Sequence, residues 1–146
     1  MNNCKLQGIG ILAFVGCLTV FPVTTVRAAG NLGKIFIKAA SPEPGGQQFA
    51  DRGLEDTVKD LKRRAGSFVV VDDEASADFL MVVVGRDDTP VSGQPTAKRI
   101  TVTLSIKDGA SWKPGVKISK VTNAWSLSAL HVIGDAKKWV QANARK

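Results

Sequence analysis

Apolar residues recur along this chain at two periods, one typical of helices and one typical of strands. Between Gln47 and Arg64 the helical spacing predicts an amphipathic helix with paired charges on its other face. Gly66 follows as a stop signal. A second helix, with Ser126 or Ser128 as its N-cap, is expected to run to about Asn143. The apolar stripes of the two helices consist of Ala50, Leu54, Val58, Leu61 and Ala65, and of Ala129, Val132, Ile133, Ala136 and Val140.

Short apolar runs bounded by turn residues predict the first strands. Lys34–Lys38 and Ser67–Val71 are short and rich in β-branched and aromatic residues. Phe79–Val84 shows no polar alternation, so we expect both of its faces to be covered. This strand should therefore be central in the sheet.

Later strands are predicted in the second half of the chain. Ile100–Ile106 alternates apolar and hydroxyl residues, which predicts a half-buried strand whose threonine face meets water. A last strand should begin at Val116, and its apolar residues change phase near Lys120, which predicts a β-bulge there. Asp87–Ala97 contains two prolines and a glycine, and is expected to be a long exposed loop.

The order β-α-β-β-β-β-α predicts an α/β (α+β two-layer) fold. We expect a mixed sheet of four or five strands with both helices on one face. The first strand-helix-strand crossover should be parallel and right-handed. Residues 29–146 should form a single domain.

Residues 1–28 have the layout of a secretory signal peptide. Lys5 supplies a positive charge, Ile9–Val23 forms an apolar run, and Val26–Ala28 offers small side chains for a signal peptidase. The apolar run is shorter than the roughly 20 residues that a membrane span needs. We therefore expect an exported protein, periplasmic or secreted, that is cut after Ala28.

Both cysteines lie inside this segment. With Cys4 and Cys17 removed, the mature chain has no cysteine to form an internal disulfide. Phe14–Cys17 resembles the lipobox of bacterial lipoproteins, although phenylalanine replaces the usual leucine and the following residues stay apolar. Lipidation at Cys17 is therefore the alternative to release, and it would anchor the protein to a membrane.

The charge of the chain favours anionic partners. Without Lys5 and Arg27, 18 basic and 13 acidic side chains remain, a net charge of +5. Such a charge favours contact with acidic proteins, acidic polysaccharides or lipid headgroups, and it also serves solubility. Membrane-surface binding is one alternative function. A nucleic-acid partner is not expected, because of the export signal and because no aromatic pair is interleaved with basic residues.

Residue types limit the chemistry. The mature chain has His131 as its one histidine, and it has no cysteine or tyrosine, which removes most nucleophilic and metal chemistries. No glycine-rich phosphate motif is present, so no cofactor is expected. An enzyme is not expected; the alternative is a small secreted hydrolase that uses the loop carboxylates Asp72, Asp73, Asp87 or Asp88.

One stretch combines a helix ending in glycine, a short strand ending in aspartate, and an Ala-Asp turn before a hydrophobic strand. The residues that carry this pattern are Leu54, Val58, Leu61, Gly66, Phe68, Val71, Asp72, Ala77, Asp78 and residues 79–84, followed later by Leu104–Asp108. The pattern resembles the amino-terminal domain of the Tol–Pal β-propeller protein and a half of the periplasmic domain of the curli-secretion lipoprotein family. The resemblance covers about half of the mature chain. It implies a small envelope domain that binds another envelope component, and it transfers no catalytic residues.

The second half of the chain holds the candidate contact residues. Trp112 lies in a hairpin bounded by glycine and proline, beside Lys113, and an aromatic ring flanked by cations suits a partner or lipid headgroups. The other reading of Trp112 is a ring folded back over the sheet edge. We predict a partner-contact surface formed by Arg99, Thr101, Thr103, Trp112 and Lys113.

Overall fold

The computed structural model describes residues 31–41, 48–91 and 94–143. Within these ranges, five strands and two α-helices follow one another in the predicted order β-α-β-β-β-β-α. The elements are β1 (Lys34–Ala39), α1 (Gln48–Arg64), β2 (Val69–Val70), the short 3-10 helix η1 (Glu74–Ser76), β3 (Phe79–Val91), β4 (Gln94–Asp108), β5 (Ser111–Thr122) and α2 (Trp125–Asn143).

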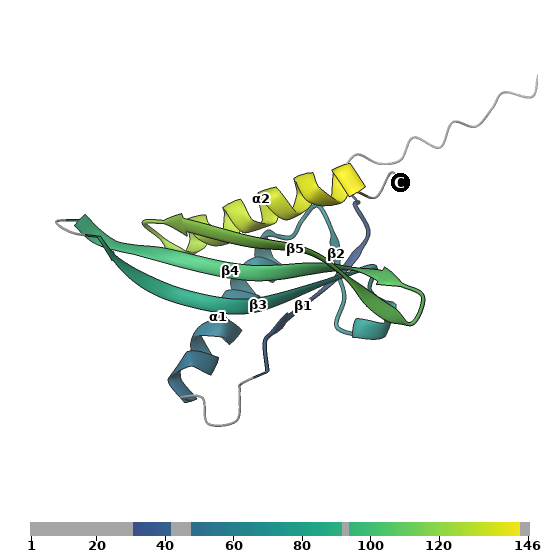
Figure 1. Ribbon diagram of the computed structural model, residues 1–146, viewed down its shortest axis with the longest axis horizontal. Helices are drawn as coiled ribbons and strands as arrows, with labels where there is room; N and C mark the ends of the chain where they lie inside the picture. Colours follow the sequence, from purple (N-terminus) through teal and green to yellow (C-terminus); the bar gives the residue numbers. More distant parts are fainter. Residues whose placement is uncertain (1–30, 42–47, 92–93, 144–146) are drawn as a thin grey trace, which may run out of the picture.

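The strands form one mixed sheet in the order β2-β1-β3-β4-β5 (Figure 1). β1 is parallel to β2 and to β3, whereas β3, β4 and β5 are connected as antiparallel hairpins. The predicted parallel crossover from β1 through α1 to β2 is confirmed. β3 lies in the middle of the sheet, as its uninterrupted apolar sequence predicts.

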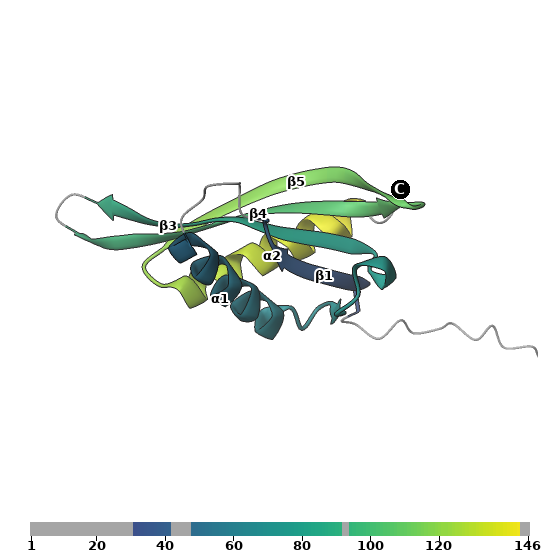
Figure 2. The same cartoon turned by 90° about the horizontal axis from the view of Figure 1, so that it is seen from below.

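Both α-helices lie on one side of the sheet (Figure 2), so the fold has the two layers expected from the sequence. Their apolar stripes meet the inward-facing residues of β1, β3 and β4, and burial of this surface is the main source of stability. The buried residues include Ile35, Ile37, Val58, Leu61, Met81, Val83, Val102, Leu104, Ala129, Val132, Ala136 and Val140.

A cluster around Trp125 fixes the start of α2 to the sheet. The guanidinium carbon of Arg86 lies 4.3 Å from the centroid of the Trp125 ring, and Lys98 Nζ lies 5.4 Å from it. Arg86 also donates a 2.8 Å hydrogen bond to the carbonyl of Gly53 in α1. One aromatic ring and one guanidinium thus link both helices to β3 and β4.

The N-cap predicted for the second helix is wrong. α2 begins at Trp125, so Ser126 and Ser128 both lie inside the helix. Ser128 is fully buried, and its Oγ donates a 2.7 Å hydrogen bond to the carbonyl of Lys98. A tertiary contact with β4 occupies the hydroxyl that the sequence suggested as a cap.

The predicted loop at Asp87–Ala97 is also wrong. β3 and β4 continue there as a two-stranded ribbon in which Asp87 pairs with Arg99 and Thr89 with Ala97. β1 pairs with β3 only as far as Val83, and β5 pairs with β4 only from Lys98 onward. Among the described strands, both ribbon strands therefore have one free edge beyond Asp88 and before Lys98. Proline lacks an N–H for the ladder and is tolerated on such edges, and its presence therefore does not exclude a strand.

The β-bulge lies elsewhere than predicted. The register of β4 and β5 shifts between Leu104 and Ser105, which pair with Val116 and Pro114, so that Gly115 is the extra residue. Beyond it β5 keeps one phase, and Val121 is 47% exposed instead of core-facing.

The surroundings of Gly115 explain the position of the bulge. A Cβ atom there would lie 2.4 Å from the carbonyl oxygen of Leu104 and 2.6 Å from the ring of Trp139 in α2. Only glycine fits this approach. Near the end of β5, Lys120 faces α2 and forms an ion pair with Asp135, which replaces the expected phase change.

The side of the sheet away from α1 and α2 is called the open face below. Cross-strand pairing and alternation place on it a row that consists of Lys38 of β1, Val82 of β3, Thr103 of β4 and Lys117 of β5. The connection through η1 crosses one end of this face, where Glu74 pairs with Lys38 at 2.7 Å.

Candidate binding surface

Four of the five predicted contact residues share the open face. Arg99, Thr101 and Thr103 are alternate residues of β4, and Trp112 lies directly across from Lys107 of the same strand. Lys113 is paired with Ile106, which packs against the core, so Lys113 lies on the helix side of the sheet. Their role in binding remains a prediction.

The expectation that the threonine face of β4 is exposed to solvent is wrong at Thr101. It points away from the helices, as predicted, but its side chain is only 9% exposed. Gly85 and Ser119 flank it on the neighbouring strands, and its hydroxyl lies 3.0 Å from that of Ser119. Thr103 is more exposed than Thr101, so the accessible threonine hydroxyl of β4 lies two residues further along the strand.

Trp112 is half-buried and anchored at one end of the open face. Its Nε1 donates a 3.0 Å hydrogen bond to Glu74, whose other carboxylate oxygen binds Lys38. Lys107 Nζ lies 5.9 Å from the centroid of the Trp112 ring. Trp112 therefore combines the two predicted roles in part. Its ring is hydrogen-bonded to η1 instead of being free in solvent, and it also lines a depression of about 580 Å³ beside Asp73.

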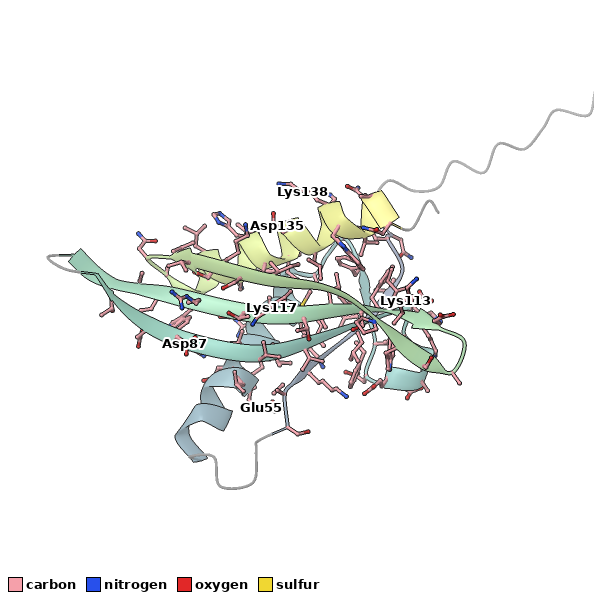
Figure 3. All side chains as sticks on the ribbon, viewed as in Figure 1. Glu55, Asp87, Lys113, Lys117, Asp135 and Lys138 are labelled. Carbon is pink, nitrogen blue, oxygen red and sulfur yellow. The ribbon has the colours of Figure 1, made fainter. Side chains whose placement is uncertain are left out.

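The open face carries positive charge without matching ion pairs. Arg99 and Lys117 form none of the ion pairs that connect described side chains. Asp87, the strand partner of Arg99, is exposed at the far end of the face. Figure 3 shows Lys117 and Asp87 on their strands. An anionic group that approaches the middle of the sheet would meet hydroxyls and cations.

The carboxylates proposed for a hydrolase occur as two separate pairs. Asp72 is 98% exposed, and Asp73 caps η1 by accepting a 3.1 Å hydrogen bond from the N–H of Ala75. Asp87 and Asp88 are successive residues of β3 and point to opposite faces, and Asp88 is paired with Lys98. Asp72 and Asp73 lie between β2 and η1, whereas Asp87 and Asp88 lie on β3 beyond Val83, where β1 no longer pairs with it. The two pairs therefore belong to different parts of the sheet.

A feature that the sequence did not reveal runs along the outer edge of β5. Two shallow depressions of about 510 and 640 Å³ lie where this strand meets α2, and Trp139 lines both. Residues 106–108 of β4 also line the larger one. Asp135 joins Lys120 at 2.5 Å and Lys138 at 3.6 Å. The hydrogen bond from Lys120 and the positive charges of both lysines lower the pKa of Asp135. No local sequence signal indicates the site, because it depends on which strand ends the sheet.

The described ranges contain neither a metal-binding cluster nor a helix that could span a membrane. Among these residues, no cluster of three or more histidine, cysteine or carboxylate side chains could hold a metal ion. No helix in the same ranges is both long and apolar enough to cross a membrane. His131 is exposed on α2.

Comparison with known proteins adds three distant structures. No protein-family model and no curated protein matches the chain. A hypothetical protein of Chlamydia trachomatis is 8% identical, with 78% of this chain and 99% of that chain covered and a TM-score of 0.47. The PelC dodecamer of Paraburkholderia phytofirmans is 13% identical, with 74% and 86% covered and a TM-score of 0.43. A minor lipoprotein of Acinetobacter baumannii is 13% identical, with 76% and 92% covered and a TM-score of 0.38.

These structural similarities concern the fold alone. At such identities and TM-scores they transfer no partner, assembly or activity to this protein. The structures similar to this chain include a minor lipoprotein and PelC, but the resemblance to the Tol–Pal protein and to the curli-secretion family stays a prediction.

Proposed function

We propose that this protein is an exported, non-enzymatic binding module of the bacterial envelope. Residues 1–28 support export through their signal-peptide pattern. The observation that carries the binding role is the open face, a broad sheet surface without an α-helix on which Arg99 and Lys117 form no ion pair with a described side chain.

An open face alone is a weak argument, because many antiparallel sheets leave one face to water. What favours a binding role here is the arrangement of the side chains. Thr103 and Lys117 lie directly opposite each other on neighbouring strands. Arg99 precedes Thr103 in β4 and lies on the same open face. The strands hold the backbone of these residues in place, so the ordering entropy lost on binding comes from the side chains and not from the backbone. The partner we propose is an envelope component with an anionic surface.

The placement of the carboxylates favours this function over hydrolysis. Two carboxylates must flank the same bond in the usual glycosidase mechanism. Asp72 and Asp73 lie between β2 and η1, whereas Asp87 and Asp88 lie in the second half of β3. We therefore give the carboxylates structural and solvating roles.

Crosslinking inside living cells tests the binding role. A photo-crosslinking residue at Thr103, on the open face, should capture a larger envelope component at native expression. The same residue at Glu55, which is exposed on α1, is the matched control and should give little product. Recovery of monomer alone from the Thr103 position would refute a partner on the open face.

The location is tested separately. Cell fractionation with sequencing of the mature N-terminus should give a soluble chain that begins at Ala29. A lipid on Cys17 would replace release by anchoring. Recovery of the uncut chain in the cytoplasm would contradict export. Binding of purified protein to anionic vesicles, lost on raising the salt, would make the membrane surface itself the partner.

A further inference from the structure

The two edges of the sheet differ. One edge is β2, which is only two residues long. The other is β5, a strand of 12 residues that pairs with β4 alone among the described strands. A free edge of this length presents unpaired N–H and carbonyl groups to any extended chain beside it.

α2 runs beside this edge of the sheet. Figure 1 shows α2 beside β5, on the side away from β4, and Figure 2 places the helix below the plane of the sheet. We call the space between them the edge groove. It is lined by residues 113–120 of β5, by Asp135, Lys138, Trp139 and Asn143 of α2 and, at one end, by residues 106–108 of β4. Its two depressions continue past Trp139 along the strand.

The edge groove is positively charged. Lys113, Lys117, Lys120 and Lys138 line it, and Figure 3 shows three of these lysines. The carboxylates of the lining are Asp108 and Asp135, and Asp135 already contacts two ammonium groups. The lysines outnumber the acidic groups of the lining, so the groove favours a negatively charged occupant.

We propose that the edge groove binds an acidic, extended segment of a partner polypeptide, which adds to the sheet as a strand beside β5. Backbone hydrogen bonds to β5 would hold the segment, and its alternate side chains would point to opposite faces. Carboxylates on one face would reach Lys117, and those on the other would reach Lys138. An apolar side chain between them would lie against Trp139.

The bulge limits where such a strand can pair. Pro114 has no N–H, and Gly115 breaks the regular ladder, so regular pairing is available from Val116 to Thr122. A second copy of this chain is disfavoured as the occupant, because joining two β5 edges would bring lysines against lysines. This inference concerns the edge of the sheet, which shares Lys117 with the open face, and it does not require Arg99 or Thr103 to bind a partner.

NMR of the exported protein with a synthetic peptide tests the proposal. The probe is a peptide in which glutamate alternates with valine, added at millimolar concentration. We expect shifts confined to residues 113–122 and α2, and about ten-fold slower hydrogen exchange for outward N–H groups of β5. Absence of these changes would overturn the proposal.

Two control peptides separate strand addition from simple charge attraction. A peptide that alternates lysine with valine should not bind. A glutamate–valine peptide that is N-methylated on alternate residues keeps its charge but loses backbone hydrogen bonds, and should bind at least about ten-fold more weakly. Equal binding of the methylated peptide would overturn the proposed strand addition. Equal binding of inorganic polyphosphate would overturn the assignment to a polypeptide partner.

A pair of double variants tests the location. Lys113→Glu with Lys138→Glu should weaken binding of the peptide by about ten-fold or more, because two attractive charges become repulsive. Lys59→Glu with Lys137→Glu changes the net charge equally, and both of these residues are exposed outside the edge groove. Equal weakening in both double variants would overturn the assignment to the groove. Crosslinking at Thr103 in the same variants reports on the open face independently.

Discussion

The two faces of the sheet are made by the same strands and have opposite properties. On the helix side, Met81 and Leu104 are fully buried against α1 and α2. On the other side, their sequence neighbours Val82 and Thr103 lie between Lys38 and Lys117. Strand alternation thus lets one segment serve both stability and surface chemistry. Substitutions one residue apart should therefore have very different effects.

The largest expected difference between the faces is at Leu104. Because this side chain is fully buried, Leu104→Ala should lower the free energy of unfolding by about 2–5 kcal/mol through lost burial and a residual cavity. The neighbouring open-face substitution Ser105→Ala should change it by less than about 0.5 kcal/mol. Urea denaturation followed by circular dichroism measures both. Similar losses for the two variants would mean that the open face is also a packed surface.

The next effect lies at the bulge of β5. Gly115→Ala would place a methyl group against Leu104 and the Trp139 ring, and should cost about 1–3 kcal/mol through overpacking. The control is Gly134→Ala in α2, where nothing lies within 4 Å of the added atom. This change should stabilise the helix by about 0.5–1 kcal/mol. Thermal melts of the two variants should shift in opposite directions, and a shared direction would contradict the role of the Trp139 contact.

Much of the covered face could be predicted from the sequence, because its signal is local. The spacing of Leu54, Val58 and Leu61 defines a helix stripe without knowledge of the partner strands. The uninterrupted run at Phe79–Val84 predicts a central strand in the same way. Element order, sheet type and the side taken by the helices all follow from such patterns.

The errors arose where the structure depends on distant contacts. The bulge lies at Gly115 because Trp139 packs against it, and nothing near Lys120 reveals that contact. Pro90 and Pro95 suggested a loop, but a ribbon with free edges accepts them. The edge groove could not be predicted, since a sequence does not say which strand ends the sheet.

A smaller effect is expected at the edge groove, on the border between the two faces. The lowered pKa of Asp135 means that its ionised form is stabilised in the folded state by Lys120. Asp135→Asn should cost only about 0.2–1 kcal/mol at neutral pH, because the pair is partly exposed. The contribution is present above the ordinary pKa of 3.8 and is lost as the pH falls below it, through the lower folded value. Urea melts at neutral and acidic pH should therefore converge for the two proteins, and a gap that widens in acid would contradict the assignment.

The smallest expected effect on stability is the one that best separates the faces. Arg99→Ala with Lys117→Ala removes two cations that form no ion pair with described side chains, so the free energy of unfolding should change by less than about 0.5 kcal/mol per substitution. Crosslinking at Thr103 should nevertheless fall several-fold, because Lys117 lies directly across from the probe and Arg99 lies on the same face of β4. Lys59→Ala with Lys137→Ala removes the same charge elsewhere and should leave the yield unchanged. A loss of stability without a loss of crosslinking would assign the open face to folding instead of recognition.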